Sequence, residues 1–475
     1  MSAHWNGMSD RCLSRRELLK NSGGGFAALA LAGLLAEESR ASAPDPRNPL
    51  ASRPPHFPAK AKRVIFLFMH GGPSQVDTFD PKPLLDRDHG KPLPFAKPRV
   101  VSGKTGNLLR SPFKFRRHGQ SGIAVSELFP HLAAQVDDLC MINSMHGSNS
   151  RHGGALLELH TGSDTFVRPS MGSWITYGLG TENQDLPGYI TVCPNLSHGG
   201  VNNWSSAFLP AVYQGTPIGS TGVASSQAKI PFITSGSTSR PLQRLELDLI
   251  QEMNRDCLDQ AQEDRALEGR IASFELAFRM QAAAPEVQEI AGETAATRTL
   301  YGLDDEATQN FGRQCLMARR FAERGVRFVQ VSHSYKWDQH SGLKKSIARN
   351  ALEVDRPIAG LVRDLKARGL LDDTLVLWGG EFGRTPTSEG DDGRDHNPHG
   401  YTMWMAGGGV KPGITYGKTD DYGYYAVEDK VHVHDLHATI LQLLGLDHKR
   451  LTYRYAGRDF RLTDVHGVLV EGVLA

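Results

Sequence analysis

Residues 64–69 have the sequence Val-Ile-Phe-Leu-Phe-Met, an apolar run that ends at His70 and the turn-forming Gly71-Gly72-Pro73. A continuous apolar run of this length is typical of a strand buried on both faces of a parallel sheet. Two similar runs follow at residues 327–331 and 374–378, and apolar residues recur at helical spacing between Leu352 and Leu365. Strand, helix and strand in this order predict an α/β fold, a doubly wound and mainly parallel sheet with helices on both faces.

The chain after residue 62 is expected to form one large domain, residues 63–475, preceded by a proline-rich lead-in at residues 44–62. An insertion is expected at about residues 163–285. Its first part, residues 163–240, is rich in Gly, Ser, Thr and Pro and predicts long loops with short strands. Its second part, residues 241–285, is charged and favours helices that cover one side of the sheet.

The first 43 residues have the three parts of an export signal. Arg15 and Arg16 are followed by an uncharged stretch from Asn21 to Ala36 and by the small-residue site Ala41-Ser42-Ala43. The paired arginines are typical of the twin-arginine route, which carries folded proteins. The apolar stretch is short and glycine-rich, so no stable membrane span is expected after cleavage. We therefore expect a periplasmic or extracellular protein; an uncleaved anchor is the alternative.

The composition excludes several classes of protein. Lys and Arg number 53 against 52 Asp and Glu, a formal net charge of +1, which argues against a nucleic-acid or general polyanion binder. The five cysteines include no CxxC pair, which excludes a zinc ribbon or a thioredoxin-type motif. The first apolar run is not followed by GxGxxG, which argues against a nucleotide-dependent oxidoreductase.

Polar side chains follow each of the first two apolar runs. Asp77 and His70 follow the first, and Asp338 and His340 follow the second within His333-Ser334-Tyr335-Lys336-Trp337-Asp338-Gln339-His340. Reactive groups of α/β sheets lie beyond the carboxyl ends of the strands, and carboxylate with imidazole is a ligand set that zinc, manganese and iron accept. The competing interpretation of Asp77 is a helix cap.

The third apolar run is followed by the densest group of polar residues. Glu381, Arg384, Asp395, His396 and His399 fall within nineteen residues that contain few apolar side chains. We expect at least one of the two histidines to bind a metal or an anion. Arg384 is a candidate to hold a phosphate or sulfate group, and a buried ion pair with Glu381 is the alternative.

Candidate nucleophiles lie in Met145–Ala155, ahead of a predicted helix. Ser148 is the preferred candidate among Ser148, Asn149 and Ser150, and His152 is a candidate acid or ligand. These serines are equally ordinary helix caps. Asp435 is expected to cap a further helix that ends near Leu444.

Together these motifs resemble a known family. GGPSQVDTFDPKP (residues 71–83), RHGGALLELHTG (151–162), WDQH (337–340), a helix with Asp355, TLVLWGGEFGRTP (374–386) and RDHNPHG (394–400) resemble the exported family of domain of unknown function fifteen-oh-one. That family is similar to the alkaline phosphatase and sulfatase superfamily, which implies an alkaline-phosphatase-like fold. The resemblance covers residues 62–475.

The resemblance implies two divalent metal ions and a Ser, Thr or modified Cys nucleophile. Carried over to this chain, Asp77 and Glu381 would hold one metal, and Asp338, His340 and either His396 or His399 the other. The chain departs from the superfamily pattern at Phe382, where a histidine is expected; His152 is a candidate replacement. The sulfatase signature C-x-P-x-R is absent, because Cys193-Pro194-Asn195 has neither its spacing nor its arginine.

These expectations lead to two functional hypotheses. The first is an exported hydrolase that depends on one or two zinc, manganese, iron or calcium ions and cleaves a phosphate or sulfate ester. Its expected substrate is an anionic ester or a sulfated or phosphorylated glycan. Catalysis would rest on Ser148, His152 and Arg384. The second is a non-catalytic binding protein on a degenerate form of the same fold.

Overall fold

The apolar run at residues 64–69 forms the central strand of a nine-stranded sheet. The protein was analysed as a computed structural model, which describes residues 48–96, 105–234, 238–260 and 264–475. The expected export signal therefore lies outside the described residues. The strand order is β14-β5-β13-β9-β1-β8-β6-β7, and β17 pairs with β5. The strands of this sheet are β1 (Arg63–Met69), β5 (Leu139–His146), β6 (Tyr189–Val192), β7 (Thr216–Ile218), β8 (Phe328–His333), β9 (Thr374–Gly379), β13 (Tyr401–Ala406), β14 (Ile414–Tyr416) and β17 (Val431–His432).

The sheet is mainly parallel, as predicted. Strand β1 pairs in parallel with β8 and β9, β6 pairs in parallel with β7 and β8, and β5 pairs in parallel with β14 and β17. Strand β13 runs antiparallel to both β5 and β9. Residues 163–240, where long loops with short strands were predicted, contribute the short strands β6 and β7, which extend the main sheet.

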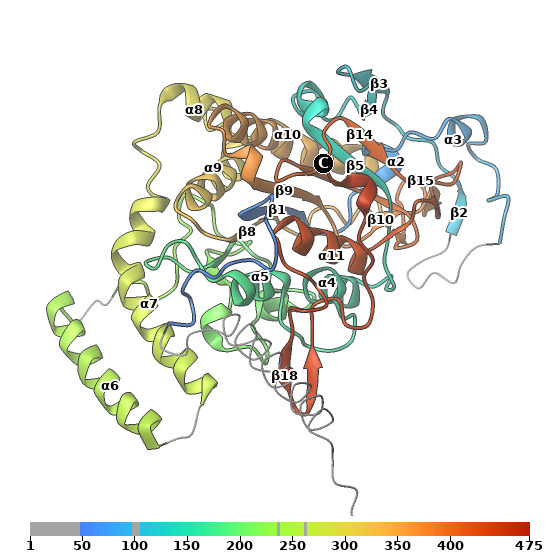
Figure 1. Ribbon diagram of the computed structural model, residues 1–475. Coiled ribbons are helices and arrows are strands. Elements are labelled where there is room, and N and C mark those ends of the chain that lie inside the picture. The colour runs from blue at the N-terminus through green and yellow to red at the C-terminus, as the bar shows by residue number, and fades with distance from the viewer. Residues whose placement is uncertain (1–47, 97–104, 235–237, 261–263) are drawn as a thin grey trace, which may run out of the picture. The chain divides into compact units, whose positions relative to one another are not determined.

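Helices lie on both sides of the central strands. In Figure 1, α4, α5 and α11 lie on one side of β1, β8 and β9, and α9 and α10 on the other. Helices α6 and α7 fall in the segment predicted to be helical without strands. No helix in the described part of the chain is long and apolar enough to cross a membrane. The helices are α2 (Gln75–Thr78), α3 (Pro83–Arg87), α4 (His152–Thr161), α5 (Met171–Leu179), α6 (Arg240–Gln260), α7 (Arg265–Gln288), α8 (Ala295–Leu300), α9 (Gln309–Glu323), α10 (Leu343–Ala367) and α11 (Val433–Leu443).

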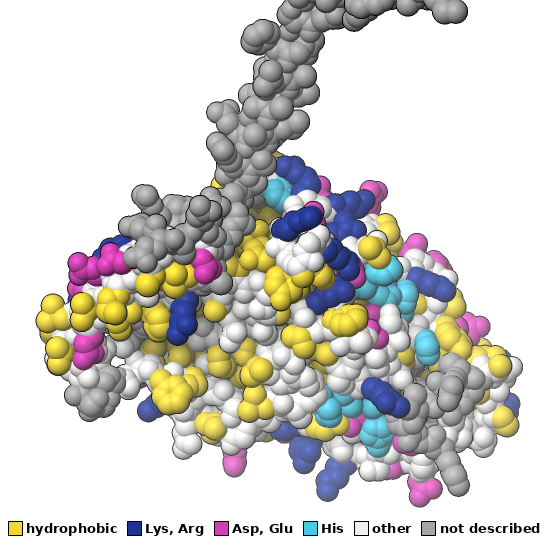
Figure 2. All heavy atoms as spheres, turned by 90° about the horizontal axis from the view of Figure 1, so that it is seen from below, with side chains coloured by type: hydrophobic (Ala, Val, Ile, Leu, Met, Phe, Trp, Pro, Cys, Tyr) yellow, Lys and Arg dark blue, Asp and Glu magenta, His cyan; other side chains and the backbone are white. Residues whose placement is uncertain are grey.

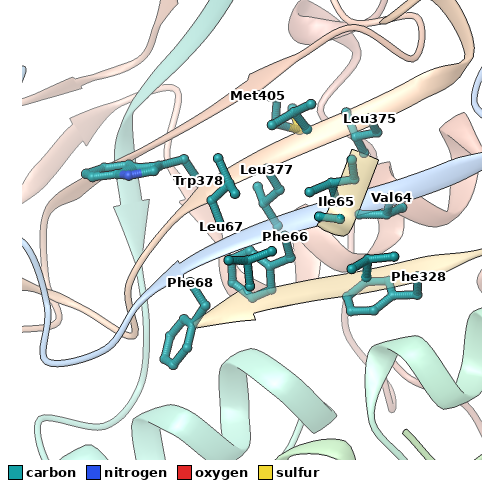
Figure 3. Close-up of a cluster of buried hydrophobic side chains, with 14 of the residues drawn as sticks. Val64, Ile65, Phe66, Leu67, Phe68, Phe328, Leu375, Leu377, Trp378 and Met405 are labelled. Carbon is teal, nitrogen blue, oxygen red and sulfur yellow. The ribbon is translucent and has the colours of Figure 1, made fainter. Parts of the chain in front are cut away.

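The core forms around β1, whose seven residues are all buried. Side chains alternate along the strand, so Phe66 and Phe68 point to one side and Leu67 to the other (Figure 3). The rings of Phe66 and Phe68 lie 5.9 and 4.8 Å from the imidazole of His160 in α4. Burial on both faces explains why the sequence of β1 is continuously apolar.

Short two-stranded ribbons surround the sheet. The pair β10–β12 lies within the segment that joins β9 to β13, and it brings residues 383–384 beside 396–397. The ribbons are β2 (Thr105–Leu108) with β11 (Thr387–Glu389), β3 (Phe115–His118) with β4 (Ile123–Ser126), β10 (Gly383–Arg384) with β12 (His396–Asn397), β15 (Lys418–Thr419) with β16 (Ala426–Glu428), and β18 (Tyr453–Tyr455) with β19 (Arg458–Phe460).

The parallel strands end at one common edge, which positions the polar loops. His70 follows β1, the loop to His152 follows β5, and the loop with Asp338 and His340 follows β8. Glu381 follows β9 at the same edge. Because β13 is antiparallel, it begins at this edge too, so the whole segment from residue 380 to 400 stays there.

The helix predicted after Asp435 begins earlier than expected. Helix α11 starts at Val433, and its N-cap is His432, whose side chain accepts a hydrogen bond from the backbone of His434. Asp435 lies at the third helical position and accepts from the backbone N–H of His432, which completes a capping box. Asp435 therefore stabilises the helix start, although it is not the N-cap itself.

Candidate metal centre

Three histidine side chains converge on one carboxylate oxygen at this edge of the sheet. The Nε2 atoms of His152, His340 and His396 lie 3.3, 2.8 and 3.2 Å from Asp338 Oδ1. The Nε2 atoms of His340 and His396 lie 3.0 Å from each other. These four side chains come from the segments that follow β5, β8 and β9, with His152 at the start of α4 and His396 in β12, and their ligand atoms all lie within 4.8 Å of one another.

The other nitrogen of each histidine is held by an acceptor. His152 Nδ1 donates to Glu381 Oε1 at 2.7 Å, and His396 Nδ1 donates to the carbonyl oxygen of Ser150 at 2.7 Å. His340 Nδ1 donates to the carboxylate of Glu389. An acceptor at Nδ1 places the proton there and leaves the Nε2 lone pair free. Such outer hydrogen bonds are what orient histidine ligands in metal sites.

This arrangement offers a set of ligand atoms that could hold a cation. Lone pairs on three Nε2 atoms and the negative charge on Asp338 face one point, and only protons or a metal ion can satisfy them together. Four ligands of a tetrahedral zinc ion with bonds of 2.0–2.1 Å lie about 3.3 Å apart. The three distances to Asp338, 2.8–3.3 Å, range from that edge length to about 0.5 Å below it. The side chains therefore fit a divalent ion held by His152, His340, His396 and Asp338.

The pKa values of Asp338 and His152 depend on the hydrogen bonds between them. Burial alone would raise the pKa of Asp338, but hydrogen bonds from the three histidines outweigh it and hold that pKa well below its usual range. Burial lowers the pKa of His152, yet its hydrogen bonds to Asp338 and Glu381 prevail and raise it. The carboxylate is thus ionised and also raises the pKa of His340, whereas burial lowers the pKa of His396.

A second group shares His152 with the first. His70, His152 and Glu381 bring one ligand atom each within 4.8 Å of the others, and all three are buried. Glu381 accepts from the backbone N–H of Gly71 at 3.0 Å, and its pKa lies at about 2. Burial would raise that pKa, but the hydrogen bond from His152 overcomes it. Burial lowers the pKa of His70 to about 4, so its imidazole is neutral and able to act as a ligand.

A third group lies beside the first and shares His340. His340, Glu389 and Asp395 also bring ligand atoms within 4.8 Å of one another. His340 is the most exposed of the four converging side chains, with 34% of its side-chain surface accessible against 15% for Asp338. The centre therefore opens to solvent beside His340.

Arg384 contacts the converging side chains through Asp338. Its guanidinium is fully buried and donates to Asp338 Oδ1 at 2.6 Å, which makes Asp338 its partner rather than the alternative, Glu381. It also donates to four backbone carbonyls, those of Gly71, Gly72, Trp337 and Arg394. A side chain enclosed in this way contacts three loops at once and does not face solvent, so its observed contacts position Asp338.

Asp77 lies apart from the converging histidines. It forms a fully buried ion pair with Arg394, with Nε to Oδ2 at 2.7 Å and Nη2 to Oδ1 at 3.2 Å. Ser74 Oγ donates to the same carboxylate at 2.5 Å. The structure therefore places Asp77 with an arginine, and not with Glu381 as the resemblance implied.

His399 and Ser148 are also outside the centre. The ring of His399 stacks with Tyr424 and packs on Tyr425, so of the two histidine candidates it is His396 that joins Asp338. Ser148 is exposed, and its hydroxyl lies 3.1 Å from Nε2 of His432. Because His432 Nδ1 accepts from the backbone of His434, its proton is on Nε2, and His432 cannot take a proton from Ser148 in this form.

Several residues around the centre were not selected from the sequence. The ring of His198 stacks 4.9 Å from His152, and Tyr335 packs 5.3 Å from His152 and donates a hydrogen bond to Asp338. Asn195 lies 3.2 Å from His70. Asn195 and His198 follow β6, so recognising residues 189–192 as a strand of the main sheet would have pointed to them.

Two glycines allow the loops to approach closely. Gly71 has φ +118°, and a Cβ there would lie 2.7 Å from the backbone of Trp337 and Asp338. A Cβ at Gly393 would collide with the carbonyl of His340. Any side chain at either position would push the loop that carries Asp338 and His340 away from its neighbours.

The chain is similar to several solved structures at low identity. Lipoteichoic acid synthase LtaP from Listeria monocytogenes is 10% identical, with 90% of this chain and 81% of that chain covered and a TM-score of 0.36. The PsFucS1 sulfatase from Pseudoalteromonas sp. is 13% identical, with 87% and 72% covered and a TM-score of 0.36. Alkaline phosphatase from the Antarctic bacterium TAB5 is 9% identical, with 82% and 99% covered and a TM-score of 0.35. No curated protein matches the sequence.

One family model spans the region that carries both the sheet and the candidate centre. It is described as a protein of unknown function, DUF1501, and it matches residues 61–474. The match covers every strand-end loop discussed above. The chain therefore belongs to the DUF1501 family, as the sequence motifs indicated.

Proposed function

We propose that this protein is an exported, metal-dependent hydrolase of phosphate or sulfate esters. The observation that carries the proposal is the convergence of three oriented histidine nitrogens on Asp338, at 2.8–3.3 Å from one carboxylate oxygen. Export is proposed from the twin-arginine motif, Arg15-Arg16, and its small-residue site. It would place the enzyme in the periplasm or outside the cell.

The residues of this chain have distinct parts in such a site. His152, His340, His396 and Asp338 would hold the ion, and Glu381, Glu389 and the carbonyl of Ser150 would keep the imidazoles in place. A divalent ion there would polarise an ester oxygen and lower the pKa of water. His70 and Glu381, which share His152 with this group, would form a second position. Zinc, manganese and iron all accept this mixture of nitrogen and oxygen ligands.

The surroundings indicate how a substrate would approach. The centre opens beside His340, and the partly exposed rings of Tyr335 and His198 lie against His152. An anionic ester that entered here would be attracted by the positive charge of the bound ion and would contact the rings of Tyr335 and His198. The N–H groups of Arg384 face backbone carbonyls and Asp338, so we assign it the role of holding Asp338 and not the ester. The substrate class proposed is an anionic ester, including sulfated or phosphorylated glycans.

One observation favours the alternative of a non-catalytic binding protein. Ser148, the preferred nucleophile, has no proton acceptor at His432 and is not hydrogen-bonded to any of the converging residues. A hydrolase built on this centre would therefore need water as its nucleophile. If the protein binds metal but cleaves neither ester type, the binding function becomes the better description.

Metal analysis with paired histidine variants tests the proposal. Protein purified without chelators should contain about one or two equivalents of zinc, manganese or iron, as expected for one or two positions. His396→Ala should lose metal, whereas the matched control His399→Ala, from the same loop, should retain it. Asp338→Ala should lose metal as well. Folded protein that neither contains nor takes up any divalent ion would refute the proposal.

Activity measurements complete the test. Aryl phosphate and aryl sulfate esters should be hydrolysed by the metal-loaded protein and not by His396→Ala. Ser148→Ala should keep its activity, because the exposed hydroxyl lacks an activating base. Loss of activity in Ser148→Ala with full metal content would show that this serine is the nucleophile after all.

A further inference from the structure

Asp395 is a buried carboxylate with one oxygen unpaired. Its exposed fraction is 2%. Oδ1 accepts a hydrogen bond from the backbone N–H of His396 at 2.7 Å, whereas Oδ2 has no hydrogen-bond partner in the described part of the chain. A carboxylate oxygen that is removed from water without a donor costs free energy, which a donor or a cation recovers. Oδ2 of Asp395 is therefore free to bind a cation.

The positive side chains nearest to Asp395 in sequence are already paired. Arg394 forms its ion pair with Asp77, and Arg384 forms its own with Asp338. The ion pairs among residues 48–96, 105–234, 238–260 and 264–475 do not include Asp395. No side chain of this part of the protein therefore balances its charge.

Glu389 and His340 place two further ligand atoms beside Asp395, in the third group described above. One atom of each of the three side chains lies within 4.8 Å of the others. Nδ1 of His340 faces the carboxylate of Glu389, while Nε2 of the same ring lies 2.8 Å from Oδ1 of Asp338. The two nitrogens point in different directions, so the third group and the candidate metal centre lie on different sides of the imidazole.

The backbone brings the side chains of the third group together. Glu389 and Gly393 exchange two backbone hydrogen bonds, at 2.9 and 3.0 Å, which close the turn between β11 and Asp395. The backbone N–H of Arg394 donates to the carbonyl oxygen of Gln339 at 2.9 Å, which fixes this turn against the loop after β8. Because the ligand atoms are already held in place, binding of an ion needs little further ordering of the chain.

The chemistry of the third group selects the kind of ion. One imidazole nitrogen with two carboxylates is a ligand set that zinc and manganese accept, whereas calcium and magnesium prefer oxygen alone. The side chains of His340 and Glu389 are 34% and 17% accessible, so an ion can reach them from solvent. Histidine side chains lie at the surface beside acidic ones on the face shown in Figure 2. The group therefore suits a zinc-type ion that enters from solvent and meets the buried Asp395.

We propose that Nδ1 of His340 and the carboxylates of Glu389 and Asp395 bind a zinc ion of their own. The ion takes the place of the proton that His340 donates to Glu389. If the candidate metal centre holds no ion, this proton moves to Nε2, which faces Asp338. If that centre holds an ion, the proton passes to solvent and the ring bridges the two ions. The site goes beyond the proposed function and shares only His340 with it.

Zinc stoichiometry tests the proposal. The protein is stripped of metal, saturated with Zn²⁺, dialysed and analysed for bound zinc, and titration calorimetry gives the affinity. Asp395→Asn should lose one equivalent, or bind it more weakly by more than the roughly 10–100-fold that loss of an outer contact causes. Glu389→Gln should lose the same equivalent, and circular dichroism shows whether each variant is folded. Equal zinc content and affinity in the wild type and in both folded variants would overturn the proposal.

Two controls separate this site from the other acidic and histidine side chains. Asp391→Asn changes an exposed carboxylate of the same turn that lies outside the group, and it should bind as much zinc as the wild type. An equal loss in Asp391→Asn would overturn the proposal, because binding would then follow surface charge. His152→Ala removes a ligand of the candidate metal centre and should keep the equivalent that Asp395→Asn loses. Zinc lost by His152→Ala and not by Asp395→Asn would overturn this site alone; the reverse would support it and count against the proposed function.

Discussion

The buried pair of Asp77 and Arg394 gives the sharpest prediction on stability. Both side chains are fully buried, and the carboxylate receives two nitrogen atoms at 2.7 and 3.2 Å. Asp77→Asn keeps the shape but removes the negative charge, which leaves the guanidinium charge of Arg394 in the interior without its counter-ion. Breaking a buried pair in this way costs about 3–5 kcal/mol.

The structure favours the lower part of that range. Arg394 keeps two hydrogen bonds in the variant, to the carbonyl oxygens of Thr385 at 3.1 Å and Leu109 at 3.0 Å. We therefore expect Asp77→Asn to lower the free energy of unfolding of the metal-free protein by about 3 kcal/mol. The double variant Asp77→Asn with Arg394→Met removes the unpaired charge, so it should recover part of this loss.

Guanidinium-induced unfolding, followed by tryptophan fluorescence, measures both variants against the wild type. Metal content is measured on the same samples, and Asp77→Asn should still bind metal at the wild-type stoichiometry. The reasoning fails if the double variant is no more stable than Asp77→Asn. It also fails if Asp77→Asn loses metal while its stability is unchanged, which would make Asp77 a metal ligand.

Three further outcomes are expected. Metal affinity should decrease as the pH is lowered from about 8 to about 6, because protons then compete with the metal for the imidazoles. His152 is readily protonated, since its hydrogen bonds raise its pKa against the effect of burial. An affinity that titration calorimetry finds constant over this range would exclude histidine ligands. Burial raises the pKa of Asp355 to about 6, so its ionised form costs stability. As pH falls from about 6 to about 4, denaturation should show the wild type gaining stability relative to Asp355→Asn; an unchanged stability difference between the two proteins would contradict it. Gly393→Ala should weaken metal binding roughly 10–100-fold by displacing His340, whereas Gly292→Ala, in open space, should have no effect on the same measurement.

The central strands could be predicted because a strand that is buried on both faces needs apolar residues at nearly every position. Strands β1 and β9 are largely apolar, β8 is apolar except for Gln330 and its last two residues, and the structure places each strand within two residues of its predicted bounds. The outer strands β6 and β7 are short and lie in a Gly- and Ser-rich segment, so their pairing depends on tertiary contacts that local sequence does not carry. The antiparallel direction of β13 is likewise set by its neighbours.

The candidate centre was predictable only to the level of which loops contribute. A residue that follows a parallel strand must lie at the carboxyl-terminal edge of the sheet. The sequence therefore predicted that the segments carrying His152, Asp338, His340, Glu381 and His396 lie near one another. The direction of each side chain depends on its partner, and that partner is distant in sequence. Asp77 turns to Arg394, 317 residues away, and His399 turns to the tyrosines at 424 and 425.

The antiparallel strand β13 has a consequence for how this centre could vary. Because the chain leaves the sheet at Gly379 and returns at Tyr401 on the same edge, the intervening segment needs no helix to carry it back across the sheet. The strand order therefore sets no fixed length for this segment, whereas its buried contacts, Arg394 with Asp77 and Arg384 with Asp338, restrict its composition. Glu381, Glu389 and His396 lie on this segment, so changes there would alter one proposed ligand of the candidate metal centre and the two carboxylates that orient His152 and His340, while the other three proposed ligands of that centre stay on their own loops.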